Sequence, residues 1–288
     1  MKANGMQNLY GWGMLSPFLA LFSAFVVAPL GFGLGLGFFS WDMLGGTPAA
    51  WIGLGNYAEA AADPYFWKSL RVTMVFVLFT VPLMVGLATA LAFLLDRAGR
   101  RQGIYRVALI LPMMINLTVI GILWRWFLNQ DFGLFNAWLG TVGIRVPWLG
   151  EPGWAMTAIV AMTLWWTVGG PAIILLAGLQ QVPPQLHEAA AIDGAGPWRT
   201  FFCVTLPVLR PVLLFVVVTQ VIASFQVFGQ TFMVTRGGPA LGTRVLVQYI
   251  YETAFTNYRM GYGAAMSWLL FLVIGAVAWA VFRLLRSE

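Results

Sequence analysis

Polar side chains interrupt an otherwise apolar stretch late in the chain, at Gln220, Ser224, Gln226 and Gln230. Amide and hydroxyl groups beside an aromatic ring such as Phe225 can hydrogen-bond to the hydroxyls of a sugar while the ring stacks on its face. The same groups also serve as ordinary hydrogen bonds between helices, so their chemistry alone leaves binding and packing open. We take these five residues as a candidate path for a polar solute.

Two earlier apolar stretches contain further residues of this kind. Asn116 follows Pro112 by about one helical turn, and a proline at this place is expected to kink its helix. The Gly-Gly-Pro sequence at 169–171 breaks helical regularity, which a membrane protein tolerates only where the backbone is buried or lines a cavity. The candidate path therefore also includes Asn116, Trp165, Trp166, Gly169 and Gly170.

Residues for covalent or metal chemistry are scarce. A single Cys203 excludes an internal disulfide, and a single His187 argues against a histidine-based metal site. The sequence contains no nucleophile–base pair and no glycine-rich phosphate loop followed by Lys and Ser or Thr. It also places no charged residue clearly in the middle of an apolar stretch, which disfavours an ion-coupled carrier. We expect no catalytic residue, no metal and no cofactor bound by this chain, so its energy must come from elsewhere.

The composition indicates an all-α integral membrane protein. Of 288 residues, 60% are hydrophobic and 9% are charged, against roughly 25% charged in a soluble domain, and the mean hydropathy is +0.82. The apolar runs are long and continuous rather than alternating, which favours helices over a barrel. We predict one transmembrane domain over residues 1–288 with about six spans, near 14–39, 70–95, 104–128, 154–180, 208–235 and 264–285.

Basic residues indicate the orientation of these spans. The net charge is +6, but Lys and Arg fall in short connections rather than on one basic face, so they report topology and not nucleic-acid binding. With six spans, most of them lie on one side, which is then the cytoplasm and holds both termini and the loop 182–207. The connection between the last two spans disagrees, since it contains Arg236, Arg244 and Arg259.

The loop 182–207 should form two short helices. Pro183 and Pro184 end the preceding helix and suit the first turn of a new one. The alanines at 189–191 favour a helix, and their short side chains allow another protein surface to approach its backbone closely. Gly194 supplies the left-handed residue that ends this helix. Pro197 then begins a second helix.

The sequence from Glu188 to Ala195, EAAAIDGA, continued by Phe201, Leu206-Pro207 and Pro211, resembles the EAA signature of permease subunits of binding-protein-dependent ABC importers. In that family the loop is a coupling helix that docks into a cleft on a cytoplasmic ATPase subunit. The resemblance assigns coupling roles to Glu188, Ala189, Ala190, Asp193, Gly194 and Ala195.

Further patterns are similar to those of the carbohydrate-uptake group, of the maltose and glycerol-3-phosphate type, among them the sequence at 51–57 and Gly237-Gly-Pro239. The chain lacks the extra spans and large periplasmic insertion of the maltose-type prototype. The resemblance implies a type I importer permease fold in the bacterial cytoplasmic membrane, in contact with lipid.

It implies as partners a second homologous permease, an ATPase dimer that uses ATP and Mg²⁺, and an extracytoplasmic binding protein that delivers a sugar. A polyol or glycerol-3-phosphate cargo, and a stand-alone secondary transporter or channel, are the alternatives; a membrane-bound enzyme is weaker still.

Overall fold

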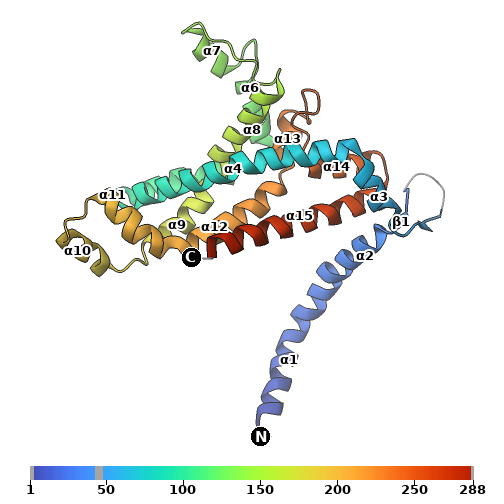
Figure 1. The fold of residues 1–288 in the computed structure, drawn as a ribbon, viewed down its shortest axis with the longest axis horizontal. Coiled ribbons are helices and arrows are strands. Elements are labelled where there is room, and N and C mark those ends of the chain that lie inside the picture. Colours follow the sequence, from blue (N-terminus) through green and yellow to red (C-terminus); the bar gives the residue numbers. More distant parts are fainter. Residues whose placement is uncertain (1–2, 43–47, 287–288) are drawn as a thin grey trace. The chain divides into compact units, whose positions relative to one another are not determined.

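The computed structural model describes residues 3–42 and 48–286, and most of them are helical (Figure 1). The first part of the chain consists of α1 (Ala3–Phe22), η1 (Ser23–Val27), α2 (Ala28–Leu36), β1 (Phe39–Ser40), β2 (Ala50–Trp51), α3 (Gly55–Ala62) and α4 (Pro64–Asp96). The middle consists of η2 (Gly99–Arg101), α5 (Gln102–Ile110), η3 (Leu111–Met114), α6 (Leu117–Phe127), α7 (Leu134–Gly140), α8 (Pro152–Thr167) and α9 (Gly169–Leu179). The last part consists of α10 (Pro184–Ile192), α11 (Pro197–Thr200), η4 (Phe201–Thr205), α12 (Leu206–Phe225), α13 (Gly229–Val234), α14 (Leu246–Tyr251), η5 (Glu252–Thr256) and α15 (Met260–Arg286).

Membrane-crossing length is reached by four continuous helical segments and two bent pairs. The continuous segments are Tyr10–Leu36, Pro64–Asp96, Pro197–Phe225 and Met260–Leu285. The bent pairs are Gly99–Met114 with Leu117–Phe127, at 92°, and Pro152–Thr167 with Gly169–Leu179, at 49°. By length and composition the described residues therefore hold four to six spans, and the prediction of an all-α protein with about six apolar segments is confirmed.

Two of the predicted spans differ from the structure. The span predicted near 208–235 is not one continuous helix, because α12 ends at Phe225 and the short α13 follows after three residues. The prediction of a kink at Pro112 understates the break in the third span. There the 3₁₀ turn η3 ends at Met114, and Asn116 caps a new helix by accepting a hydrogen bond from the Thr118 N–H at 2.8 Å.

The chain was predicted as one domain, and it divides into two compact units. Unit 1 comprises residues 1–64 and 250–271, and unit 2 comprises residues 65–249 and 272–288. In unit 1, β1 and β2 pair antiparallel, with Phe39 opposite Trp51. The ring of Trp51 packs edge-on against Phe39 and stacks with Phe38, at centroid distances of 5.1 and 5.5 Å. Aromatic packing therefore stabilises this two-residue ladder.

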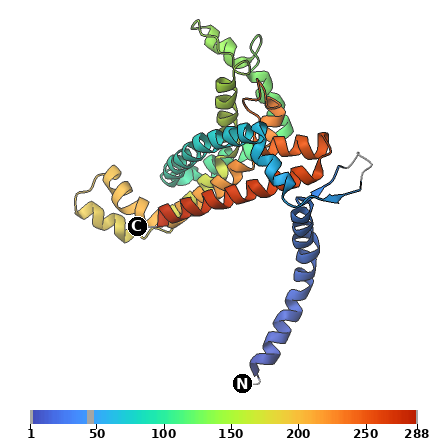
Figure 2. The same cartoon turned by 45° about the vertical axis from the view of Figure 1, so that its right-hand side comes forward.

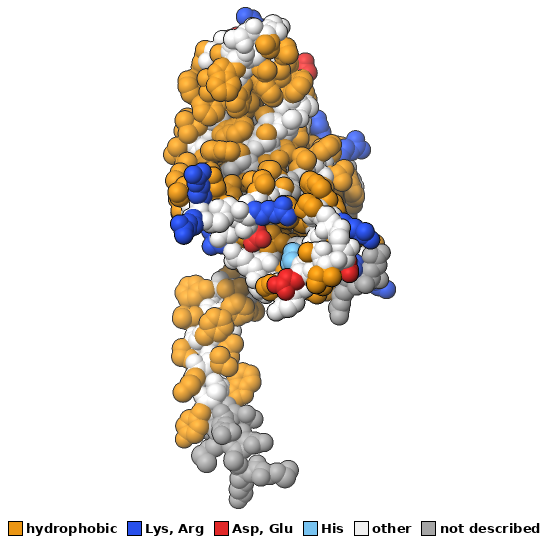
Figure 3. All heavy atoms as spheres, turned by 90° about the vertical axis from the view of Figure 1, so that its left-hand side faces the viewer, with side chains coloured by type: hydrophobic (Ala, Val, Ile, Leu, Met, Phe, Trp, Pro, Cys, Tyr) orange, Lys and Arg blue, Asp and Glu red, His pale blue; other side chains and the backbone are white. Residues whose placement is uncertain are grey.

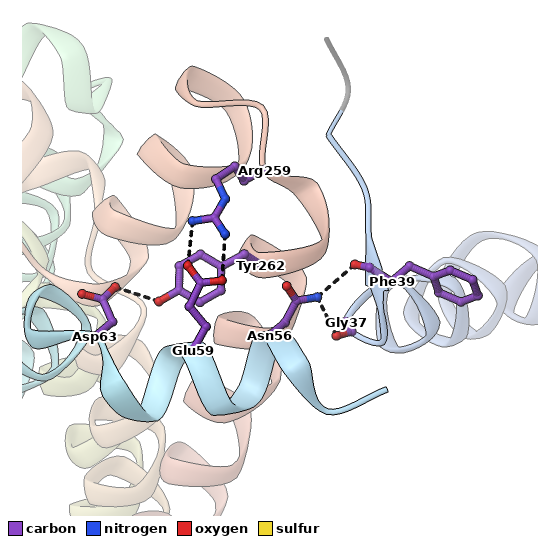
Figure 4. Close-up of polar contacts among 7 residues, drawn as sticks. All are labelled: Gly37, Phe39, Asn56, Glu59, Asp63, Arg259 and Tyr262. Atoms are coloured by element: carbon purple, nitrogen blue, oxygen red, sulfur yellow. Dashed lines mark hydrogen bonds and ion pairs between the residues drawn. The ribbon is translucent and has the colours of Figure 1, made fainter. Parts of the chain in front are cut away.

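Polar contacts join α3 to the other elements of unit 1 (Figure 4). The amide of Asn56, which is 3% exposed, donates to the carbonyl oxygens of Gly37 and Phe39, both at 2.9 Å. One turn along α3, Glu59 accepts two hydrogen bonds from the guanidinium of Arg259, at 2.8 and 2.7 Å. The hydroxyl of Tyr262 donates to Asp63 at 2.7 Å. These side chains recur every three to four residues, so one face of α3 makes all the contacts.

Unit 2 is built on α4, α9 and α12, whose buried side chains form one cluster. Met84, Ala88 and Leu95 of α4 pack with Leu175 of α9 and Leu209 of α12. Small residues bring the helices close. A Cβ on Gly178 of α9 would lie 2.7 Å from the Leu209 side chain, which is the use that membrane helices commonly make of glycine at their interfaces. In Figures 1 and 2, α6, α7 and α8 rise away from α4, while α10 and α11 form a hairpin between α9 and α12.

Candidate coupling loop and solute path

The loop predicted at 182–207 forms a helical hairpin. Pro183 has an extended backbone and α10 starts at Pro184, as the two prolines predict. At the other end Gly194 is left-handed, with φ of 71°. The Ala195 N–H bonds to the Ala190 carbonyl at 2.9 Å and the Gly194 N–H to that of Ala191 at 3.1 Å. This pair of bonds is a Schellman motif, so Gly194 ends α10 in the predicted way.

The six residues assigned to coupling do not all face outward. Glu188, Ala189, Asp193 and Gly194 are exposed, whereas Ala190 is only 7% exposed and packs within the hairpin. A hollow of about 350 Å³ lies between α10 and α11–η4, and its lining includes Ala189, Asp193 and Arg199. The surface that a partner can reach therefore consists of one edge of α10 and this hollow.

Exposed apolar side chains flank the hairpin. Ile192 is 86% exposed, Trp198 72% and Phe202 57%. The rings of Trp198 and Phe202 stack at 6.4 Å, as expected from their four-residue spacing. Figure 3 views the molecule from the end at which α10 and α11 lie, where charged and hydrophobic side chains are interspersed. Nothing in the sequence signals the exposure of Ile192, because a helix end can place its last residue on any side.

The candidate solute path contains three backbone breaks in consecutive apolar segments. The third segment breaks at Asn116, the fourth between α8 and α9, where Gly169 begins α9, and the fifth between Phe225 and Gly229. The predicted break at 169–171 is confirmed by the 49° bend there. In a membrane-spanning region, irregular backbone is tolerated where it is buried in protein or lines a cavity.

Glycine contacts bring these three breaks together. A Cβ on Gly169 would overlap the carbonyl of Leu109, and one on Gly170 would lie 3.8 Å from Met113 in η3. A Cβ on Gly229 of α13 would in turn overlap the side chain of Leu117 at the start of α6. The fourth and fifth segments therefore both contact the third beside its break.

Candidate path residues occupy different environments around these breaks. Asn116 and Gln226 are exposed, and Gln220, Gln230, Trp166 and Gly170 are half-buried. Ser224 and Phe225 are buried at 5% and 0% exposure, so neither reaches a solute without helix movement. Gln226 is the C-cap residue of α12 and Gln230 lies on α13, so these two amides, although four residues apart in the sequence, do not lie on the face of one helix.

Aromatic side chains surround this region. The rings of Trp165 and Trp124 lie 5.9 Å apart, and Trp165 is 46% exposed. The indole Nε1 of Trp166 is buried and has no hydrogen-bond partner among the described residues. An indole N–H normally finds an acceptor when buried. Of the candidate path residues, Trp166 thus has an unused donor.

A buried polar network after α13 was not anticipated. The hydroxyls of Thr235 and Thr243 lie 2.6 Å apart, and Thr243 donates to the Gly238 carbonyl at 2.7 Å. Between them Ala240 and Leu241 have left-handed φ values of 49° and 61°, a strained conformation for residues other than glycine. The only signal in the sequence was the run of glycine, proline and threonine, which is typical of many turns.

Comparison with known proteins identifies the family. Residues 73–287 match the model of the binding-protein-dependent transport system inner membrane component. The chain belongs to this family. It is 33% identical over 276 residues to the sulfoquinovosyl glycerol transport system permease protein SmoG of Agrobacterium fabrum, covering 96% of this chain and 90% of SmoG. It is 35% identical over 244 residues to the sn-glycerol-3-phosphate transport system permease protein UgpA of the same organism, covering 84% and 83%.

A solved structure shows the same fold. The chain matches a subunit of a bacterial ABC transporter involved in the import of the acidic polysaccharide alginate, with a TM-score of 0.83 and 22% identity over 99% of this chain and 98% of that one. This inner membrane component thus has the importer permease fold that the EAA resemblance implied. Membership in a transport family also agrees with a role in translocation.

Proposed function

We propose that this inner membrane component is a non-catalytic permease subunit of an ATP-driven importer that translocates a sugar delivered by an extracytoplasmic binding protein. It works with a second homologous permease and an ATPase dimer, which binds ATP and Mg²⁺ in place of this chain. Family membership supports the transport role. The observation that carries the proposal is the α10 hairpin, where a Schellman turn at Gly194 presents the exposed Glu188 and Asp193.

The hairpin is suited to transmit force. It connects α9 directly to α11, η4 and α12, and α9 and α12 both belong to the core cluster that holds unit 2 together. A push on the hairpin therefore moves packed helices rather than a loose loop. Closure of the ATPase pair would shift these helices as a rigid body and alternate access between the two sides of the membrane.

The three breaks provide the place for the solute. Exposed Asn116 and Gln226 offer amides, and Trp165 offers a ring face close to the same breaks. Amides and aromatic faces without a fixed charge match a neutral polyhydroxylated solute. A sugar is therefore the cargo we favour. Glycerol-3-phosphate or a polyol is the alternative, because UgpA is a glycerol-3-phosphate system permease.

The hairpin can be tested in the complex with its ATPase and binding protein reconstituted in vesicles. Gly194→Val forces a β-branched residue into a left-handed position, whereas Gly194→Asn is the matched control because asparagine tolerates it. A Cβ at this position meets no atom within 4 Å, so differences arise from the backbone alone. We expect Gly194→Val and Glu188→Lys to abolish ATP-driven uptake and Gly194→Asn to retain it. Normal uptake and assembly in both damaging variants would refute the coupling assignment.

A separate measurement decides which solute the importer transports. Uptake of radiolabelled disaccharide, polyol and glycerol-3-phosphate by the same vesicles is compared, each with and without excess unlabelled competitor. Transport of a neutral sugar supports the proposal. Transport of glycerol-3-phosphate alone, with no sugar competing, would instead establish the alternative cargo.

A further inference from the structure

A groove between the end of α4 and α5 has an apolar lining. Its walls are formed by Leu91, Leu94, Leu95, Tyr105, Ala108 and Leu109, and its volume is about 320 Å³. Leu94 is 65% exposed and Tyr105 46%, so the groove is open to the surroundings of unit 2. Apolar walls of this kind favour hydrocarbon over a soluble, hydrogen-bonding ligand.

Basic side chains lie close in sequence to the groove walls. The connection from α4 to α5 contains Arg97, Arg100 and Arg101, and Arg106 follows within α5, whereas Asp96 at the end of α4 is the single acid between residues 96 and 106. Arg97, Arg100 and Arg101 are exposed, and Arg106 is half-buried with its Nε atom lacking a hydrogen-bond partner. Within the described parts of the chain none of the four forms a salt bridge. Their charge is therefore available to an external anion.

Helix geometry places these charges beside the apolar walls. The guanidinium carbon of Arg97 lies 4.0 Å from the ring centroid of Phe93, which packs against Phe201 on a different face of α4 from the groove. Arg101 precedes the groove residue Tyr105 by four residues, which is about one helical turn. Arg101 and the adjoining Arg100 therefore lie on the short connection between the two groove walls.

The connection that bears the arginines is held in one conformation. Gln102 Nε2 donates to the Leu95 carbonyl at 3.1 Å, and the same oxygen accepts a hydrogen bond from the Ala98 N–H at the end of α4. Gly99, at φ of 53°, allows the tight turn into η2. Groove and rim are therefore preorganised, which reduces the ordering that a ligand must cause.

We propose that this groove binds an anionic phospholipid. One acyl chain lies against the leucines of α4 and the α5 face at Tyr105 and Ala108, and the phosphate lies beside Arg100 and Arg101. A basic connection alone would attract any anionic surface, whereas the adjoining apolar groove selects a ligand that has both a phosphate and a hydrocarbon chain. The proposal concerns a lipid site and is independent of the identity of the cargo.

Native mass spectrometry of the detergent-purified complex tests this. The probes are dioleoyl phosphatidylglycerol and dioleoyl phosphatidylcholine added in equal amounts. We expect phosphatidylglycerol to be retained preferentially, and an Arg100→Gln/Arg101→Gln variant to lose this preference by about fivefold or more, since each basic residue near an anionic surface contributes about that factor. Ala108→Trp fills the groove without altering charge and should lower phosphatidylglycerol retention as well.

Matched controls separate the groove from general effects. Arg145→Gln removes an exposed arginine elsewhere in unit 2, and Ile122→Trp enlarges an exposed apolar residue away from the groove; both should retain the lipid as the native chain does. Ala108→Met serves if the tryptophan variant fails to assemble. Equal retention of the two lipids by the native chain would overturn the proposal. So would full retention in the Ala108 variants, or displacement of the lipid by millimolar inorganic phosphate alone, because the groove would then contribute nothing.

Discussion

Gly169 of α9 lies so close to the backbone carbonyl of Leu109 in α5 that any Cβ at position 169 would overlap it. The two residues belong to the fourth and third apolar segments, and each precedes or begins a break in its helix. Backbone contact here fixes the two bent pairs to each other. The bend between α8 and α9 is thus maintained by an interface and not only by a local lack of helix propensity.

Replacement of Gly169 by alanine should destabilise the permease. The added methyl meets backbone, which cannot rotate away, so we expect a loss of about 1–3 kcal/mol or failure to assemble. Thermal melting of the purified chain followed by size-exclusion chromatography measures this. Gly170→Ala is the matched control, since its Cβ would lie 3.8 Å from the flexible end of Met113 and should be tolerated. Equal melting temperatures for both variants would show that this contact is not tight.

The polar face of α3 allows the stability contributed by a buried hydrogen-bonding amide to be compared with that contributed by an exposed ion pair. Asn56→Ala removes two buried hydrogen bonds to Gly37 and Phe39 and leaves their carbonyls without this donor, so we expect a loss of about 1–3 kcal/mol. Glu59→Gln weakens an ion pair with Arg259 whose side chains are 43% and 46% exposed, and this should cost about 0–1 kcal/mol. Melting curves of the two variants show which substitution destabilises the protein more. A larger effect for Glu59→Gln would mean that charge, and not burial, stabilises this contact.

If Gln226 lines the solute path, its substitution should affect solute uptake more than ATP hydrolysis. Gln226→Ala removes an exposed amide beside the breaks and should lower uptake about 3–10-fold, the equivalent of one or two lost neutral hydrogen bonds. ATPase activity stimulated by the binding protein should change less. Gln181→Ala, an exposed glutamine between α9 and α10, is the control. If Gln226→Ala lowers uptake and assembly together, the residue is structural and does not line a path.

The sequence predicted those features that depend on local chemistry. Pro184, Gly194 and Pro197 each impose a backbone conformation by their own covalent structure, and the hairpin boundaries follow them within a residue or two. The apolar segments were predictable for the same reason, because the bilayer requires about 20 apolar residues per helix. Glu188 and Asp193 are exposed on this hairpin, which the resemblance to the EAA signature required.

Features that depend on tertiary contacts were not predictable. The apolar run continues past Phe225, yet the helix ends there, and α13 packs with Gly229 against Leu117 in another segment. Asn116 was taken as a candidate path residue. Asparagine before an apolar run is also a common helix cap, and that signal would have located the break. Ala190 could not be assigned to the interior of the hairpin, because its burial depends on how α11 folds back.

The single cysteine provides a direct test of orientation. Cys203 is exposed in η4, next to the hairpin, so on the predicted topology it faces the cytoplasm. A membrane-impermeant maleimide should therefore label the permease in inverted vesicles and not in intact spheroplasts. Cys203→Ser with Thr141→Cys moves the thiol to the α7 end, and should reverse the pattern. Labelling of Cys203 in sealed spheroplasts would place the hairpin outside, where no cytoplasmic ATPase could drive it, and both the topology and the proposed coupling would then be wrong.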